Sequence, residues 1–276
     1  MLADHDFFLE VRRGNVPGYS ILEGLGERDS IGTTAAGEDI TRINELSSTP
    51  AAPGSHLFIP RPADAGEQMT IISENDADNG GTATGALTVC IKYLDATGNP
   101  QTEIVTMNGT TAVNTTATDI RFVQELQVLT VGSNTTAEGH IRIYRFGTNT
   151  RVYNMIAAGG NQSLVPHRMV PFGKTFYGHS WTCSEMSNSK RSRVRLRADC
   201  SNAVVPVRQA DVFLFKSVMA LDGSVGTAPL AFAAPALSVI KASAWAVVSG
   251  AEIGVHWWGV LVGPGGRSID LATVAG

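Results

Sequence analysis

The sequence predicts an all-β protein in which an N-terminal extended arm precedes two β-sandwich or jelly-roll-like domains. Gly, Ser, Thr and Asn are abundant while Lys, Glu and Leu are sparse, a balance that favours strands and turns over helices. Short segments of alternating apolar and polar residues recur between turn residues, as in sandwiches and barrels. The length of 276 residues fits two domains, because domains usually hold about 100 to 200 residues.

Residues 1–64 are predicted to form the arm, which we expect to be largely irregular. The turn-rich segment Gly14–Ser20 follows a short apolar start, and four prolines between Pro50 and Pro62 interrupt any regular pattern. So long a segment without regular structure is uncommon inside a compact domain, and its scattered apolar residues favour ordering against a partner. The residues expected to anchor the arm are Phe7, Phe8, Arg12, Arg13 and Tyr19.

Residues 65–156 are predicted to form the first β-sandwich domain. The segment Leu87–Tyr93 alternates apolar and polar side chains, and a second alternating segment ends at Asn108-Gly109, a strong hairpin signal. Further short strands follow at similar spacing, which indicates a sandwich or a barrel.

Residues 157–276 are predicted to form the second β-sandwich domain. Its last strand, Ile253–Leu261, carries apolar or aromatic side chains on both faces. Such a strand is expected to be central in its sheet or covered by a partner.

The sharpest break in composition lies in the second domain, where five of the 21 Lys and Arg residues fall between Lys190 and Arg197. In a strand, successive side chains point to opposite faces, so four arginines would share one face. Like charges on one face repel, and the row therefore calls for acidic groups on a neighbouring strand, another subunit or a polyanion, unless it is a solvated face. The predicted partner-binding residues are Arg191, Arg193, Arg195 and Arg197.

No pattern in the sequence predicts a catalytic, cofactor or metal site. Gly178–Thr182 lacks the final glycine of a nucleophile elbow, and the six histidines are scattered. Glu74–Gly81 has the acidic spacing of a calcium loop, but Leu87 occupies the place of the closing carboxylate, and hairpin-turn chemistry explains the segment better. We therefore expect a protein that is not an enzyme and needs no cofactor or metal.

Trp181 and Trp258 are candidates for stacking on a sugar ring, because aromatic faces pack against pyranose rings as they do against other apolar surfaces. A tryptophan in a strand is more often part of a core or an interface. A glycan site is therefore the minor interpretation.

The remaining features concern compartment and partners. The three cysteines, Cys90, Cys183 and Cys200, include no metal-binding pair, although Cys183 and Cys200 could form a disulfide if their strands are neighbours. The N-terminus has no apolar segment of signal-peptide length, and no 18-residue apolar run occurs. These features predict a cytoplasmic product without a membrane partner. A net charge of −4 argues against coating of nucleic acid.

Several segments, in order along the chain, carry a resemblance to a known group of proteins. They are FLEVRRGNVPGYS (Phe8–Ser20), LDATGNPQTEIVTMNGTT (Leu94–Thr111), IRFVQELQV, PFGKTFYGHSW (Pro171–Trp181) and RVRLR. Together they resemble tailed-bacteriophage virion structural proteins that have tandem β-sandwich or jelly-roll units behind an N-terminal arm. The chain departs from that pattern between about residues 20 and 59, where it has few of the motifs of the group.

The resemblance implies a non-enzymatic virion protein that is made in the host cytoplasm and decorates the neck or tail. It would dock on other virion proteins through its arm and form a homo-oligomer. One alternative is a capsid decoration or head-fibre protein, and another is a receptor- or glycan-binding module. A nucleic-acid role for the arginine row ranks below both.

Overall fold

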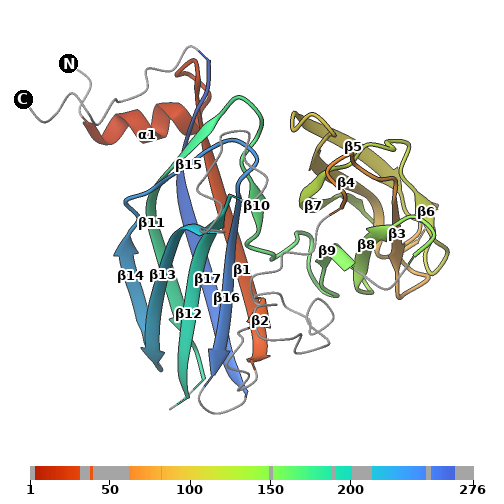
Figure 1. Cartoon of the computed structure of the whole chain (residues 1–276). Helices are drawn as coiled ribbons and strands as arrows, with labels where there is room; N and C mark the ends of the chain where they lie inside the picture. Colours follow the sequence, from red (N-terminus) through yellow and green to blue (C-terminus); the bar gives the residue numbers. More distant parts are fainter. Residues whose placement is uncertain are drawn as a thin grey trace, which may run out of the picture.

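The structure, a computed structural model, describes residues 4–31, 38–39, 62–81, 83–148, 152–187, 190–200, 213–246 and 250–264. These ranges contain one helix, α1 (Asp4–Arg12), and the other regular elements are strands with antiparallel pairing. The predicted all-β class is therefore confirmed. The strands form two sandwiches that lie side by side (Figure 1).

The first sandwich pairs a four-stranded sheet with a three-stranded one. The four-stranded sheet has the order β6-β3-β8-β9 and the other the order β5-β4-β7. Their core is a single apolar cluster whose members all lie between Met69 and Ile156. The strands are β3 (Met69–Ser73), β4 (Ala86–Leu94), β5 (Pro100–Thr106), β6 (Val113–Asn114), β7 (Phe122–Val131), β8 (Ile141–Arg145) and β9 (Val152–Ile156).

The second sandwich is built from two five-stranded sheets. In one, which we call the β11 sheet, the order is β1-β17-β11-β14 and β15 also pairs with β11. In the other, the β12 sheet, the order is β10-β16-β12-β13 and β2 pairs with β16. The β11 sheet contains β1 (Tyr19–Ile31), β11 (Thr175–Glu185), β14 (Val225–Pro229), β15 (Ala233–Ala234) and β17 (Ala251–Val262). The β12 sheet contains β2 (Glu38–Asp39), β10 (Arg168–Met169), β12 (Arg191–Asp199), β13 (Phe213–Asp222) and β16 (Val239–Ala246).

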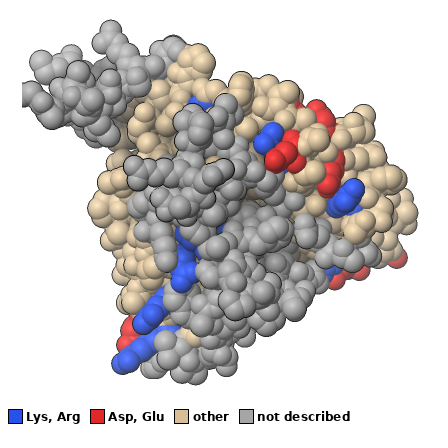
Figure 2. Space-filling model, viewed as in Figure 1, with Lys and Arg blue, Asp and Glu red and all other residues tan. Residues whose placement is uncertain are grey.

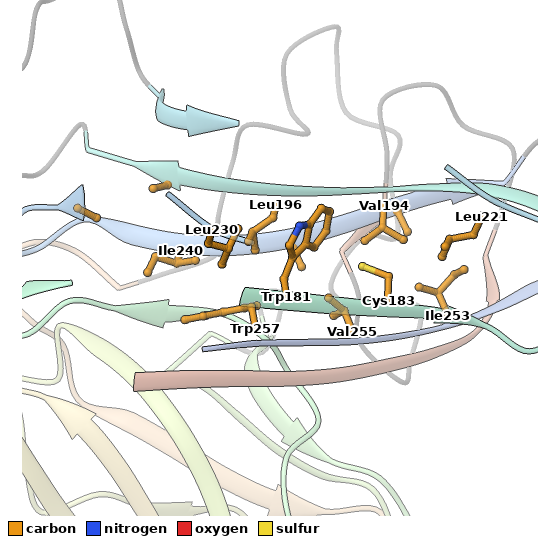
Figure 3. Close-up of a cluster of buried hydrophobic side chains, with 14 of the residues drawn as sticks. Trp181, Cys183, Val194, Leu196, Leu221, Leu230, Ile240, Ile253, Val255 and Trp257 are labelled. Atoms are coloured by element: carbon orange, nitrogen blue, oxygen red, sulfur yellow. The ribbon is translucent and has the colours of Figure 1, made fainter. Parts of the chain in front are cut away.

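The core of the second sandwich lies between these two sheets. Trp181 and Cys183 point from β11 toward Val194 and Leu196 of β12, and Trp257 fills the same layer from β17 (Figure 3). The strand β17, expected to be central or covered, lies between β1 and β11. It thus has a hydrogen-bonded neighbour on each side.

The prediction of an irregular arm is wrong for residues 4–31. The strand β1 pairs with β17 from Tyr19↔Val262 to Ile31↔Ala251, so this segment belongs to the second sandwich. The first sandwich is therefore an insertion between β2 and β10 of the second. Residues 32–37 and 40–61 of the predicted arm lie outside the described residues.

The sequence pattern did not predict β1 because two of its inward positions are glycines. A Cβ on Gly24 would lie 2.4 Å from the ring of Trp257, and one on Gly26 would lie 2.4 Å from Pro166. Neighbouring side chains fill the space that apolar side chains of β1 would otherwise take. The usual alternation of large apolar and polar residues is therefore missing, although the strand is regular.

The two sandwiches contact each other through a small apolar cluster. Leu94 and Phe122 of the first meet Met169, Leu237 and Val239 of the second. Beside it, the Gln124 side chain donates to Met169 O (2.6 Å) and accepts from Met169 N (3.1 Å). The side-chain amide of Gln124 thus makes the two backbone hydrogen bonds that a neighbouring strand would otherwise make with Met169. It links the two sandwiches at this point.

All three cysteines are free and buried, so the disulfide considered between Cys183 and Cys200 is not formed. Burial raises the pKa of the Cys183 thiol above its usual value. Ser238 Oγ donates to Cys200 Sγ at 3.2 Å. Both thiols act here as small core groups.

We predict that Gly24→Ala lowers the free energy of unfolding by about 1–3 kcal/mol, because the new methyl group would overlap the indole of Trp257. Denaturant unfolding of the full chain measures this. The control is Gly81→Ala, where no atom lies within 4 Å of the added Cβ. Equal stability of the two variants would contradict the packing of β1 on Trp257.

Candidate interaction surface

The arginine row lies on the outer face of β12, the strand between β13 and β16. Val194, Leu196 and Ala198 point inward and are fully buried in the core. The alternate positions therefore face outward, as the sequence predicted. In Figure 2, Lys and Arg side chains gather in a line along the side that carries β12.

Exposure falls steadily along the row. Arg191 and Arg193 are exposed, Arg195 is partly buried, and Arg197 retains only 1% of its accessible surface. Arg197 Nη2 donates to Ser243 Oγ at 2.9 Å, and burial lowers the pKa of Arg195. The prediction that all four arginines bind a partner is therefore wrong for Arg197, which lies inside the fold.

The neighbouring strands set the electrostatics of the row. Arg191 pairs with Asp222 of β13, with 3.3 Å between Nε and Oδ2. Further along, Arg197 is in register with Lys241 of β16, which is itself buried. The short strand β2 pairs with β16 in the same sheet, and its Asp39 is in register with Ser243. The exposed end of the row thus lies beside a carboxylate of β13, and the buried end lies beside Lys241 and Ser243 of β16.

Apolar residues of β13 flank the exposed arginines, a feature that the sequence reasoning missed. Val218 is in register with Arg195 and is 48% exposed, and the exposed Ala220 is in register with Arg193. Side chains alternate between the two faces of β13, so the sequence indicated two sets of residues. The register with β12 was needed to tell which set faces outward. We call Arg191, Arg193, Arg195, Val218 and Ala220 together the cationic strip.

The predicted arm anchors make contacts within the chain. Phe8 meets Trp258 and His179 edge-on, with ring centroids 5.3 Å and 5.0 Å apart. Phe7 meets Tyr19 at 5.5 Å. The guanidinium of Arg12 lies 2.8 Å from the carboxylate of Glu23, and Arg13, the residue after α1, pairs with Glu10 of that helix. Phe7, Phe8 and Arg12 thus hold α1 against the second sandwich.

The two tryptophans proposed for sugar stacking do not form a platform. Trp181 is 1% exposed and belongs to the core, which contradicts its proposed role. The ring of His179 stacks on that of Trp258 at 4.1 Å, and Phe8 covers it edge-on. The aromatic surface of Trp258 thus serves to attach α1.

The calcium-like segment is organised by a buried carboxylate that accepts four hydrogen bonds. Asp78 Oδ1 accepts from the backbone N–H groups of Ala86 and Glu138, and Oδ2 accepts from Ser73 Oγ and Gly139 N. These donors use the lone pairs that a cation would need. Among the described residues, no group of three His, Cys, Asp or Glu side chains could hold a metal ion.

A groove of about 480 Å³ lies between the two sandwiches. Tyr93 and Glu125 line it from the first sandwich, and Glu23, Arg168 and Lys174 from the second. Arg168 is buried, which lowers its pKa although Glu125 and Glu23 oppose that effect, and its Nη1 donates to two backbone carbonyls. Glu125 pairs with Lys92, and Glu23 pairs with Arg12. The groove therefore contains acidic and basic side chains, and both of its glutamates are in ion pairs.

No helix in the described part of the chain is long and apolar enough to cross a membrane.

Comparison with known proteins identifies no family. No family model matches the chain, and no curated protein matches it. A structure of infectious bursal disease virus, Gx strain, is 10% identical, with 94% of this chain and 79% of that chain covered at a TM-score of 0.23. The VP2 subviral particle of infectious bursal disease virus is 8% identical, with 94% and 78% covered at a TM-score of 0.23. These TM-scores support neither a family nor a function.

We predict that Asp78→Ala lowers the free energy of unfolding by about 3 kcal/mol or more, because four donors lose their acceptor. Urea unfolding measures the change. Asp76→Ala, which alters an exposed carboxylate of the same loop bonded to Thr110, should have a clearly smaller effect. Equal losses would mean that Asp78 does not organise the loop.

We also predict a gradient of chemical reactivity along the row. Labelling of the folded protein with an arginine-specific dicarbonyl should modify Arg191 about tenfold or more faster than Arg197, because Arg197 reacts only when the sheet opens. Mass spectrometry of the peptides measures both rates. In denaturant the two rates should converge, and equal rates in the folded protein would refute the burial of Arg197.

Proposed function

We propose that this chain is a non-enzymatic structural protein of a tailed-bacteriophage virion that decorates the neck or tail. The resemblance of Phe8–Ser20, Leu94–Thr111 and Pro171–Trp181 to such proteins suggests the class. The observation that carries a docking role is the cationic strip, an outward row of arginines on an otherwise mildly acidic protein.

The composition of the strip suits protein docking. Arg binds carboxylates in a bidentate manner and releases bound water more readily than Lys, which favours it in interfaces. The strip combines these cations with Val218 and Ala220, so a partner would gain apolar contact as well as charge pairing. The partner that fits this surface presents carboxylates around an apolar centre.

The proposed docking element differs from the one that the sequence suggested. Residues 4–31 are not an extended arm, because α1 packs on Trp258 and β1 pairs with β17. We therefore assign docking to the cationic strip. The two sandwiches pack on each other through Leu94, Phe122 and Met169. This packing suits a subunit that contacts different neighbours with its two sandwiches.

Other placements in a particle predict different copy numbers. A neck or tail ring holds few subunits, whereas a capsid decoration or head-fibre protein covers the shell in many copies. The receptor or glycan alternative loses its main support, since Trp181 is in the core and Trp258 is packed against His179 and Phe8.

We predict that antibody raised against the full chain labels purified parent particles at the vertex that carries the tail. Immunogold electron microscopy measures this. Label spread over the head would identify a decoration protein instead. Absence of label, with the antibody shown to bind the folded purified protein and with no peptide of the chain found by mass spectrometry of the particles, would refute the virion proposal.

A further inference from the structure

The second sandwich presents two outer faces of opposite charge. The outer face of the β12 sheet carries the cationic strip, and the outer face of the β11 sheet carries carboxylates. The two sheets pack back to back around one core, so these faces point in opposite directions. A single subunit therefore offers complementary surfaces that cannot meet each other.

The carboxylates of the β11 sheet come from β1 and β17. Glu27 is in register with Gly254, and Glu252 lies two residues before Gly254, so both are on the outer side. Glu252 is exposed and Glu27 is partly exposed. No described residue forms an ion pair with either carboxylate, whereas Glu23 on the same face pairs with Arg12.

Apolar side chains accompany these carboxylates on the same face. Leu25 is in register with His256 and is 45% exposed. Val225, at the other edge of the sheet, is in register with Ser184 and is 69% exposed. We call Leu25, Glu27, Val225 and Glu252 the acidic face. It resembles the cationic strip in composition, since each combines a majority of charges of one sign with exposed aliphatic groups; the minority charges, Asp222 and Arg12, are paired within the subunit.

We propose that copies of this chain associate head to tail, with the cationic strip of one subunit on the acidic face of the next. Contact between two different surfaces repeats from subunit to subunit and produces a ring when the rotation closes, or a filament when it does not. The inference rests on the proposed function in that it names the neighbour of the strip. Its test uses the purified protein alone.

Charge favours this arrangement over a two-fold one. Two cationic strips facing each other would bring arginines together, and like charges across an interface cost several kcal/mol by general estimates. Contact of the strip with the acidic face of a second copy instead brings charges of opposite sign together. It also leaves one strip and one acidic face open at the ends of every open chain.

The test is a pair of charge-reversal variants of the full chain, Arg191→Glu/Arg193→Glu and Glu27→Lys/Glu252→Lys. Sedimentation velocity is run for each variant alone and for an equimolar mixture, at about 50 mM and about 500 mM salt, because screening weakens exposed charge pairs. Arg145→Glu, which reverses one charge on an exposed residue of the first sandwich that pairs with Glu67, is the control for charge reversal outside the two faces. Circular dichroism verifies that all variants fold.

We expect the wild type and Arg145→Glu to form oligomers at low salt that dissociate at high salt. Each double variant alone should associate about tenfold or more weakly, since its two faces then carry the same sign. The mixture should regain association, because the native acidic face of the first variant meets the native strip of the second.

Three results would overturn the inference: a wild type that stays monomeric, double variants that associate like the wild type, or a mixture that associates no better than its components. The last would indicate a two-fold contact or an interface elsewhere. Self-association without labelling of particles would refute the proposed virion role and keep the head-to-tail contact. Labelled particles with a monomeric wild type would do the reverse.

Discussion

The packing of Trp257 against β1 is the constraint on which the second sandwich depends. Its indole occupies the space over Gly24, and its Nε1 donates to Pro166 O at 3.0 Å. It thereby fastens an N-terminal strand and the segment that returns from the inserted domain to the same point of the core. The carbonyl of Pro166 also satisfies a fully buried indole N–H, which would otherwise be costly.

This arrangement makes the two sandwiches unequal in how they assemble. The first core uses residues between Met69 and Ile156 only, so its contacts close within one continuous stretch of chain. The second core needs β1 to pair with β17, more than two hundred residues later. Closing so long a loop is entropically unfavourable, and prior folding of the insert shortens its effective length. If the insert folds first, it lowers the entropic cost of pairing β1 with β17.

The same two-residue period that builds the core also builds the surface. On β12, Val194 and Leu196 enter the core, and the arginines between them must face outward. The flanking strands then decide what each arginine meets: Asp222 stands beside Arg191, whereas Arg197 lies in the sheet near Lys241 and Ser243. One row of identical residues therefore has a structural end and an exposed end. The exposed end, on the side opposite Glu27 and Glu252, gives the domain its charge polarity.

The sequence by itself determined the all-β class and the outward direction of the arginine row, because both follow from local alternation of side chains. Turn residues and hairpin signals such as Asn108-Gly109 likewise act over a few residues. Only the tertiary structure decided that β1 is a strand of the second sandwich, since its inward glycines are filled by Trp257 and Pro166 from distant parts of the chain. The burial of Arg197 and Trp181 was decided in the same way. Exposure depends on which strands and sheets lie alongside, and that choice is made by contacts between residues far apart in sequence, which no local pattern records.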